Sequence, residues 1–313
     1  MRRRHFLGAA GGLAIAGCAS IAPKPSSLAE SSSAPSPSPT ASVSTPPSTS
    51  VTATAAATPS ASAESSASAT GLLAGTNHNV AAKAYAYPAQ SVQSWLRQGA
   101  KAPDYPTEKI AFLTIDDGPS ANRTSDVLDL LKQLGVPATY FYIVGPLGVQ
   151  HVDRAIPLRA LAEGHALAIH TWSHSYKVLY PGRIGNVANI TADYDKAYQA
   201  MRDLLGPDYV THASRYPGGH MSWKSLAPAD AALEQRGLYW LDWNTEIGDG
   251  ELKAPPNGAA AVTFFANTLK AAGNPNVVVV LMHDAEGAPL INGALPGVVK
   301  ILKAAGYTFG IIA

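Results

Sequence analysis

The chain has a single cysteine among its 313 residues, Cys18. One cysteine cannot form an intramolecular disulfide, so an ordinary hydrophobic core must stabilise the folded part. Charge is also scarce, because charged residues make up 14% of the chain and the formal net charge is +1. Three of the 23 basic residues are arginines at positions 2–4, and the remaining 20 face 22 acidic residues. This balance gives no reason to expect nucleic acid or a strongly anionic polymer as a partner.

The apolar run near the N-terminus, residues 6–16, is too short to span a bilayer and is typical of a signal peptide. Residues 3–7 resemble a twin-arginine export signal, and residues 15–18 (IAGC) resemble a bacterial lipobox, in which the cysteine is lipidated. We interpret residues 1–18 as a signal peptide with a lipobox and leave the export route open. A chance cysteine, or an uncleaved anchor, is the alternative. The interpretation predicts a protein on the extracellular side of a bacterial cell membrane, anchored by a lipid on Cys18.

A segment of low complexity follows the lipobox. Residues 19–70 consist almost entirely of Ser, Ala, Thr and Pro, so they have too little apolar bulk to pack and are predicted to form a disordered tether. A coil of about fifty residues spans roughly 40 Å root-mean-square. We expect residues 71–108 to be transitional, with a short helix at 89–98, and residues 109–313 to form one folded domain.

Apolar segments rich in β-forming residues alternate with amphipathic stretches along the predicted domain. Strands are expected at 110–115, 138–144, 166–169, 213–216, 238–242, 277–282 and 307–311. Helices, each stopped by a glycine, are expected at 124–134, 157–163, 192–205, 226–236, 260–272 and 296–305. This alternation predicts an α/β fold with a parallel sheet, open or closed into a barrel. Residues 277–282 are continuously apolar, as expected for a strand covered on both faces.

Ionisable side chains gather where these predicted strands end. They are Asp116 and Asp117, His170, Arg215, Asp242, and His283 with Asp284. A single such residue is ordinary turn chemistry, but in parallel α/β folds the carboxyl ends of the strands meet and carry the active site. Ionisable groups after five strands therefore predict a site.

Two of these groups have the chemistry of a metal site. Asp116 and Asp117 precede a Gly-Pro turn, and His170 and His174 are four residues apart, so they would meet on one face if this segment is helical. A carboxylate and two histidines form a ligand set for a divalent metal such as Zn²⁺. The second carboxylate remains free for proton transfer, which predicts a metal-assisted hydrolase.

Taken in order, the segments resemble the motifs of the polysaccharide deacetylases, the NodB-homology group that forms carbohydrate esterase family four. The matching segments are residues 114–120 (TIDDGPS), 170–174 (HTWSH), 215–219 (RYPGG) and 281–283 (LMH). The resemblance covers residues 109–313 and implies a distorted (β/α) barrel. That family's seven β/α repeats agree with the seven strands expected above.

The resemblance also implies a ligand set. Asp117, His170 and His174 would hold a divalent metal, expected to be Zn²⁺ with Co²⁺, Ni²⁺ or Mn²⁺ as alternatives. Thr171 would fix the loop beside this metal.

The remaining catalytic roles follow from the same resemblance. Asp116 would be the general base, and Arg215 would pair with it and orient it. The backbone N–H of Gly218 would stabilise the oxyanion. His283 would protonate the leaving amine, and Leu281 would line a pocket for the acetyl methyl group.

Two departures from the family pattern stand out. Many relatives have an aromatic residue where this chain has Gly218-Gly219, so one wall of the sugar groove is expected to be missing or supplied elsewhere. A fourth motif, which contains a carboxylate that tunes the acid histidine, is only loosely present in residues 242–249 (DWNTEIGD). Asp242, Glu246 and Asp249 all remain candidates for this tuning carboxylate.

The sequence therefore predicts a lipid-anchored, monomeric, metal-dependent hydrolase that removes acetyl groups from a cell-surface polysaccharide. Peptidoglycan is the favoured substrate, because the anchor and tether would hold the enzyme against its own cell wall. A chitooligosaccharide deacetylase or an acetyl xylan esterase is the alternative among enzymes. The alternative from another class is a catalytically silent carbohydrate-binding lipoprotein.

Overall fold

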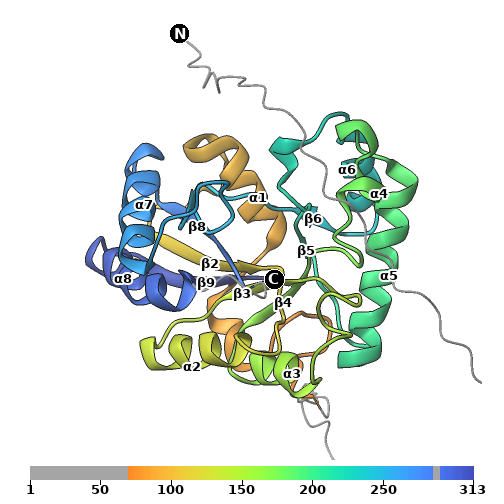
Figure 1. Cartoon of the computed structure of the whole chain (residues 1–313), viewed down its shortest axis with the longest axis horizontal. Coiled ribbons are helices and arrows are strands. Elements are labelled where there is room, and N and C mark those ends of the chain that lie inside the picture. The colour runs from red at the N-terminus through yellow and green to blue at the C-terminus, as the bar shows by residue number, and fades with distance from the viewer. Residues whose placement is uncertain (1–69, 285–289) are drawn as a thin grey trace, which may run out of the picture. The chain divides into compact units, whose positions relative to one another are not determined.

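The computed structural model describes residues 70–284 and 290–313, which are built around one parallel sheet (Figure 1). Seven strands curve into an open barrel in the order β6 (Tyr239–Trp240), β5 (Ala213–Ser214), β4 (Ala166–Ile169), β3 (Thr139–Tyr142), β2 (Ile110–Asp116), β8 (Val277–His283) and β7 (Thr245–Glu246). Beside the first half of β2, β9 (Thr308–Ile312) pairs with β2 and with β1 (Ala86–Tyr87). The predicted distorted (β/α) barrel is confirmed.

Helices cover the outside of this sheet (Figure 1). The α-helices are α1 (Ala89–Gln98), α2 (Thr124–Leu134), α3 (Ala155–Ala162), α4 (Tyr176–Leu179), α5 (Val187–Leu205), α6 (Ala227–Glu234), α7 (Gly258–Ala271) and α8 (Leu290–Ala304). Short 3₁₀ helices are η1 (Ala81–Tyr85), η2 (Gly99–Lys101), η3 (Pro181–Arg183) and η4 (His220–Ser222). Local signals explain several ends: Asn186 and Asn257 accept hydrogen bonds from the first turns of α5 and α7, and Gly135 ends α2 in the left-handed region.

The predicted elements agree closely with the observed ones. All seven predicted strand segments contain a strand, and α1 and α2 have the predicted bounds. The prediction for the last helix was wrong at its start, because α8 begins at Leu290 and contains Pro296 within it. The short elements β1, β7 and α4 were not predicted, since two to four residues carry no periodicity.

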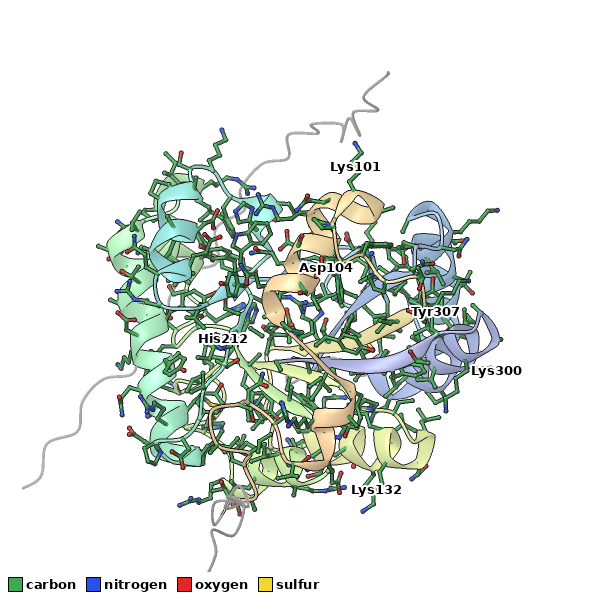
Figure 2. All side chains as sticks on the ribbon, turned by 180° about the vertical axis from the view of Figure 1, so that it is seen from behind. Lys101, Asp104, Lys132, His212, Lys300 and Tyr307 are labelled. Atoms are coloured by element: carbon green, nitrogen blue, oxygen red, sulfur yellow. The ribbon has the colours of Figure 1, made fainter. Side chains whose placement is uncertain are left out.

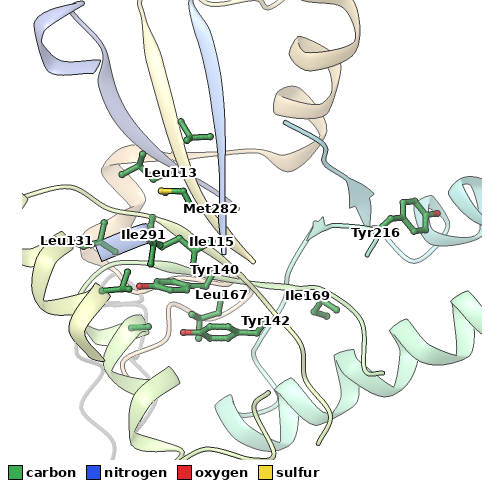
Figure 3. Close-up of a cluster of buried hydrophobic side chains, with 14 of the residues drawn as sticks. Leu113, Ile115, Leu131, Tyr140, Tyr142, Leu167, Ile169, Tyr216, Met282 and Ile291 are labelled. Carbon is green, nitrogen blue, oxygen red and sulfur yellow. The ribbon is translucent and has the colours of Figure 1, made fainter. Parts of the chain in front are cut away.

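The central strand β2 is buried along its whole length. Its side chains alternate: Leu113 and Ile115 pack with the outer helices, as Figure 3 shows, whereas Phe112 packs inside the barrel. The neighbouring strand β8 is buried through Met282, which confirms that residues 277–282 are covered on both faces. A strand fixed on both faces holds the groups at its carboxyl end in a defined place.

Residues 71–108 belong to the same packed unit. Leu72 is fully buried in the main core, and β1 pairs with β9 near the C-terminus. Val92 and Trp95 of α1 pack with Phe112 inside the barrel. The expected boundary near Lys109 therefore marks only the start of the first long strand. The packed domain already includes residues from Leu72 onward.

Most of the N-terminal predictions concern residues outside the described part of the chain. The signal peptide and lipobox (1–18) and the tether (19–70) lie there, apart from Thr70 at its edge. Within residues 70–284 and 290–313, no helix is long and apolar enough to cross a bilayer. Anchoring through Cys18 stays a prediction from the sequence.

A chain that begins at Lys109 should be much less stable than one that begins at Thr70. It would lose the buried side chains of Leu72, Val92 and Trp95. Burial of one large apolar side chain contributes about 1.5–3 kcal/mol, and a whole domain is stable by only about 5–15 kcal/mol. Thermal unfolding followed by circular dichroism measures the difference, and equal melting temperatures would show that residues 70–108 are dispensable.

Candidate active site

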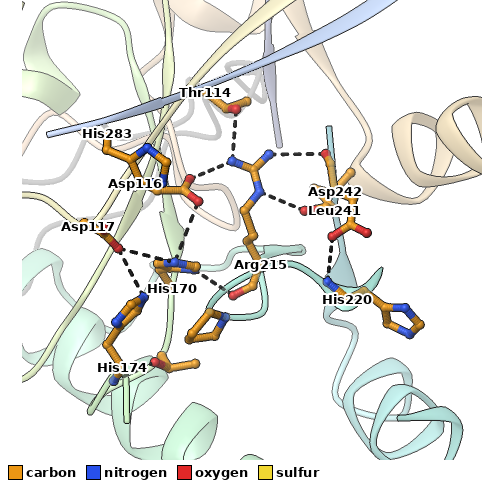
Figure 4. A network of polar contacts seen from close by, with 12 residues as sticks. Thr114, Asp116, Asp117, His170, His174, Arg215, His220, Leu241, Asp242 and His283 are labelled. Carbon is orange, nitrogen blue, oxygen red and sulfur yellow. Dashed lines mark hydrogen bonds and ion pairs between the residues drawn. The ribbon is translucent and has the colours of Figure 1, made fainter. Parts of the chain in front are cut away.

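The functional candidates meet at the carboxyl ends of the barrel strands. Asp116 ends β2, and His283 ends β8. These ends open into a cleft of about 350 Å³. This main cleft is lined by Asp116, Asp117, His170, His174, Tyr176, Gly218, Gly219, Met221, Ser222, Trp243, Glu246, Gly250, Glu251, Leu281 and His283. All predicted site residues except Thr171, Arg215, Asp242 and Asp249 line it. Arg215 contacts the lining residue Asp116 (Figure 4), and Asp249 contacts the lining residue His283. Asp242 accepts a hydrogen bond from the backbone N–H of His220, outside the lining.

The segment that carries the two histidines is a loop, so the helical condition for a shared face is not met, and the loop itself brings the two rings together. Residues 170–175 lie between β4 and α4, with Thr171 at φ 73° and His174 at φ 50°. Left-handed conformations cost about 1–3 kcal/mol in residues other than glycine, so neighbouring groups must hold them. Thr171 Oγ1 accepts a hydrogen bond from His174 N at 3.1 Å, which agrees with the loop role expected for Thr171.

Asp193 of α5 also holds this loop, a contact that was not predicted. Its Oδ1 accepts hydrogen bonds from the backbone N–H groups of Trp172, at 2.6 Å, and Ser173, at 3.1 Å. A carboxylate in the middle of a helix is indistinguishable in sequence from an ordinary exposed residue. Only the packing of α5 beside the loop reveals the contact.

Asp117, His170 and His174 converge as predicted, with one ligand atom from each lying within 4.8 Å of the others. Asp117 Oδ1 is 3.2 Å from His174 Nε2 and 3.5 Å from His170 Nε2. His170 Nδ1 is 2.8 Å from the carbonyl oxygen of Arg215. Since a carbonyl only accepts, Nδ1 carries the proton and Nε2 presents its lone pair to Asp117.

A cation fits this cluster. Burial lowers the pKa of His170 well below its ordinary value and also lowers the pKa of His174, which favours the neutral form of both rings. Asp117 Oδ1 is buried and has no hydrogen-bond partner among the described residues. A carboxylate oxygen facing two unprotonated ring nitrogens lacks a positive partner, which a divalent ion would supply.

Asp116 is held by Arg215, whose side chain is fully buried (Figure 4). Arg215 Nη1 donates to Asp116 Oδ1 at 2.6 Å and to Thr114 Oγ1 at 3.0 Å. Burial raises the pKa of Asp116 to about 6, although Arg215 and His283 act in the opposite direction. The predicted pairing of these two residues is present, and the carboxylate can gain and lose a proton near neutral pH.

Asp249 is the carboxylate that contacts His283. Its Oδ1 lies 2.8 Å from His283 Nδ1, and its Oδ2 accepts from the backbone N–H of His283 at 2.8 Å. Burial alone would lower the pKa of His283, but the hydrogen bond and charge of Asp249 help to raise it to about 9. Of the other two candidates, Asp242 accepts from the backbone N–H of His220, and Glu246 lines the cleft without a hydrogen bond to His283.

Asp284 is a buried carboxylate whose role was not predicted. It accepts hydrogen bonds from Ser120 Oγ, at 3.1 Å, and from Thr124 Oγ1. A Cβ on Gly118 would lie 3.0 Å from Asp284 Oδ2, so glycine allows the close approach. Asp284 thereby ties the end of β8 to the turn that carries Asp116 and Asp117.

Aromatic side chains from other segments lie beside Gly218. A Cβ on Gly218 would lie 3.1 Å from Tyr176 Oη and 3.2 Å from Trp223 Cζ2. Tyr176 and Trp223, here called the aromatic wall, contact each other edge to face with ring centroids 5.0 Å apart. Leu281 of β8 is buried on the cleft floor.

A second polar cluster holds the loop that carries Gly218. His220 Nε2 lies 2.9 Å from Asp230 Oδ2, and Tyr216 Oη donates to Asp230 Oδ1 at 2.9 Å. The His220 ring also stacks on Trp240 with centroids 3.8 Å apart. None of these contacts was predicted, because Asp230 belongs to α6 and reaches Tyr216 and His220 only when this helix packs against the loop.

An open (β/α) barrel with Asp116, His283 and an Asp-His-His cluster at one mouth has an arrangement suited to a hydrolase. A family model described as polysaccharide deacetylase matches residues 104–234. The chain belongs to the polysaccharide deacetylase family.

Several known proteins are similar to this chain. A peptidoglycan-N-acetylglucosamine deacetylase from Bacillus cereus is 30% identical over 201 residues, which cover 64% of this chain and 68% of the relative. A chitin deacetylase from a Pestalotiopsis species is 31% identical over 231 residues, covering 73% and 71%. The solved structure of a Streptococcus mutans CE4 esterase is 38% identical with a TM-score of 0.71, covering 78% of this chain and 99% of that one.

Replacing Asp249 with asparagine should lower the pKa of His283 from about 9. The variant removes the carboxylate that raises this pKa and keeps the burial that lowers it. In protein treated with a chelator, the chemical shifts of the His283 ring protons against pH measure the change. A titration midpoint that stays near 9 would assign the raised pKa to Asp116 and Asp117 instead.

Proposed function

We propose that the protein is a metal-dependent deacetylase that hydrolyses the N-acetyl groups of aminosugars in a cell-surface polysaccharide, with peptidoglycan as the favoured substrate. One observation carries this proposal. The Asp116–Arg215 pair and the His283–Asp249 pair flank the Asp117–His170–His174 cluster within a single cleft. Amide hydrolysis needs a base, an acid and a polarising charge at one place, and this cleft brings together side chains suited to each.

Asp117, His170 and His174 would hold the divalent ion. Zn²⁺ is the expected ion, because a carboxylate and two neutral imidazoles suit it, and Co²⁺, Ni²⁺ and Mn²⁺ are alternatives. When bound, such an ion polarises a carbonyl group and lowers the pKa of a water molecule. The other groups of the cleft then carry out the proton transfers.

Asp116 is the proposed general base. Its carboxylate is held in one orientation by Arg215 Nη1, and with a pKa of about 6 it is largely ionised at neutral pH. It would accept the proton of the attacking water. The backbone N–H of Gly218, which has no acceptor among the described residues, would donate to the oxygen that gains negative charge.

His283 is the proposed general acid. An amine leaves only when protonated, and Asp249 keeps the His283 ring protonated at neutral pH by raising its pKa to about 9. Since the acid must carry its proton, activity should fall as pH rises through this pKa. Leu281 would contact the methyl group of the acetyl from the cleft floor.

The surroundings of the site support a polymeric substrate. A second hollow of about 330 Å³ shares Asp117 and His174 with the main cleft. Its lining includes Ile143, Pro146 and Leu147. A second hollow that adjoins the cleft at these two residues offers room for more than one sugar of a chain. The preference for peptidoglycan rests on the proposed signal peptide, lipid anchor and tether, and on the relatives described as peptidoglycan-N-acetylglucosamine deacetylases.

Other substrates of the same chemistry are the main alternatives. The similarity to a chitin deacetylase favours chitooligosaccharides as the second candidate. The same groups would also cleave an acetyl ester, as in an acetyl xylan esterase. A silent carbohydrate-binding protein is disfavoured because every group of the metal, base and acid sets is in place.

Acetate release from defined peptidoglycan, chitooligosaccharides and acetylated xylan tests the proposal. We expect the highest kcat/KM on peptidoglycan, loss of activity after removal of the metal with a chelator, and recovery on addition of Zn²⁺. A higher kcat/KM on acetylated xylan would mean that the natural substrate is an acetyl ester and that the enzyme is an esterase. No release from any of the three, with bound metal verified, would favour the silent binding protein.

Asp116→Asn should keep the metal and lose about 10²–10⁴-fold in kcat, the contribution of a general base. His174→Ala should instead lower the metal content together with the activity, because it removes a ligand. Mass spectrometry of bound zinc, measured beside acetate release, separates the two variants. Full activity of Asp116→Asn would assign the base to another group.

A further inference from the structure

Tyr176 presents a free hydroxyl group to the main cleft. It is the first residue of α4, its side chain is 46% exposed, and it lines the cleft beside His174. Its ring lies 5.5 Å from the His174 ring, centroid to centroid. Among the described residues its hydroxyl has no hydrogen-bond partner, so the group is available to a ligand.

This hydroxyl lies next to the backbone of Gly218. The position that a Cβ would take on Gly218 is 3.1 Å from Tyr176 Oη. Gly218 has φ 77°, a conformation that favours glycine, and a side chain there would press against both residues of the aromatic wall. The glycine therefore lets the Tyr176 hydroxyl lie close to the residue whose backbone N–H is the proposed oxyanion donor.

The position of the aromatic wall is well fixed. Trp223 Nε1 donates to the carbonyl oxygen of Pro217 at 2.8 Å, which ties the wall to the loop that carries Gly218. Behind it, Tyr180 stacks on Trp223 with ring centroids 4.1 Å apart. Tyr176 is thus placed by packing on Trp223 and His174, and its hydroxyl makes no hydrogen bond to the described residues.

We propose that the Tyr176 hydroxyl is a second donor, beside the Gly218 N–H, to the acetyl oxygen that gains negative charge during hydrolysis. Two donors that converge on one oxygen stabilise the charge as it develops. This inference rests on the proposed deacetylase function and adds a catalytic residue outside the motifs recognised in the sequence.

The test compares Tyr176→Phe with Tyr180→Phe in the zinc-loaded protein. Both variants delete one tyrosine hydroxyl from rings that contact Trp223, but the Tyr180 hydroxyl is buried away from the cleft and has no partner among the described residues. We expect Tyr176→Phe to lose about 10²-fold in kcat, the size of the loss of one oxyanion donor. The loss should be equal on N-acetylglucosamine oligomers and on an activated acetate ester, because both develop the same oxyanion. Tyr180→Phe should keep the activity of the parent protein.

Acetate binding gives a readout that does not depend on turnover. The product carboxylate presents oxygens to the same donors, so titration calorimetry with acetate should show roughly tenfold weaker binding to zinc-loaded Tyr176→Phe than to the parent protein. Melting temperatures of both variants check that the fold is retained.

Three results would overturn the inference: unchanged kcat in Tyr176→Phe, a change confined to KM on oligomers, or unchanged acetate binding. A change in KM alone would mean that the hydroxyl binds the sugar. If the parent protein releases no acetate from any substrate, the proposed function fails, and the acetate titration still decides whether Tyr176 is a donor.

Discussion

The geometry of the site depends on the buried guanidinium of Arg215. Its nitrogens donate to Asp116 and Thr114 on β2 and to the carbonyl oxygens of Leu241 and Asp242 beyond β6. Its own carbonyl oxygen accepts from His170 Nδ1, so the same residue orients the base and one predicted metal ligand. Burying an ion pair costs several kcal/mol per ion before its attraction is counted, and apolar replacements are often as stable. The pair is therefore better explained by the orientation it imposes than by stability.

The pKa values of two ionisable groups in the site, Asp116 and His283, are both raised, but to different values. Burial raises the pKa of Asp116 to about 6, and Asp249 and the nearby carboxylates raise the pKa of His283 to about 9 against the effect of burial. Between these values Asp116 is ionised while His283 is protonated, which is the state that a base and an acid need before reaction. The gap between the two pKa values depends on partners outside the cleft lining. Arg215 keeps the pKa of Asp116 from rising further, and Asp249 raises the pKa of His283.

Sequence reasoning succeeded where one local pattern decides the outcome. Apolar runs defined the strands, and Gly135 marked the end of α2. Sequence reasoning failed where a residue's hydrogen-bond partner comes from a distant segment. Three carboxylates stand within eight residues at 242–249, and only the pairing of two-residue β7 with β8 brings Asp249 to His283. His170 and His174 were correctly grouped from their chemistry, but the geometry is that of a strained loop held by Asp193, which periodicity cannot reveal.

The departure at Gly218 shows how a local loss can be compensated by tertiary structure. An aromatic side chain at this position would extend from the loop itself, whereas this chain brings Tyr176 from α4 and Trp223 from beyond η4 to the same place. A Cβ on Gly218 would be 3.1–3.2 Å from atoms of Tyr176 and Trp223, so both residues would have to shift slightly to accept a side chain there. Gly218 and the aromatic wall therefore form one feature. A substitution that restores an aromatic residue at Gly218 would have to displace Tyr176 and Trp223, and would also strain the backbone at φ 77°.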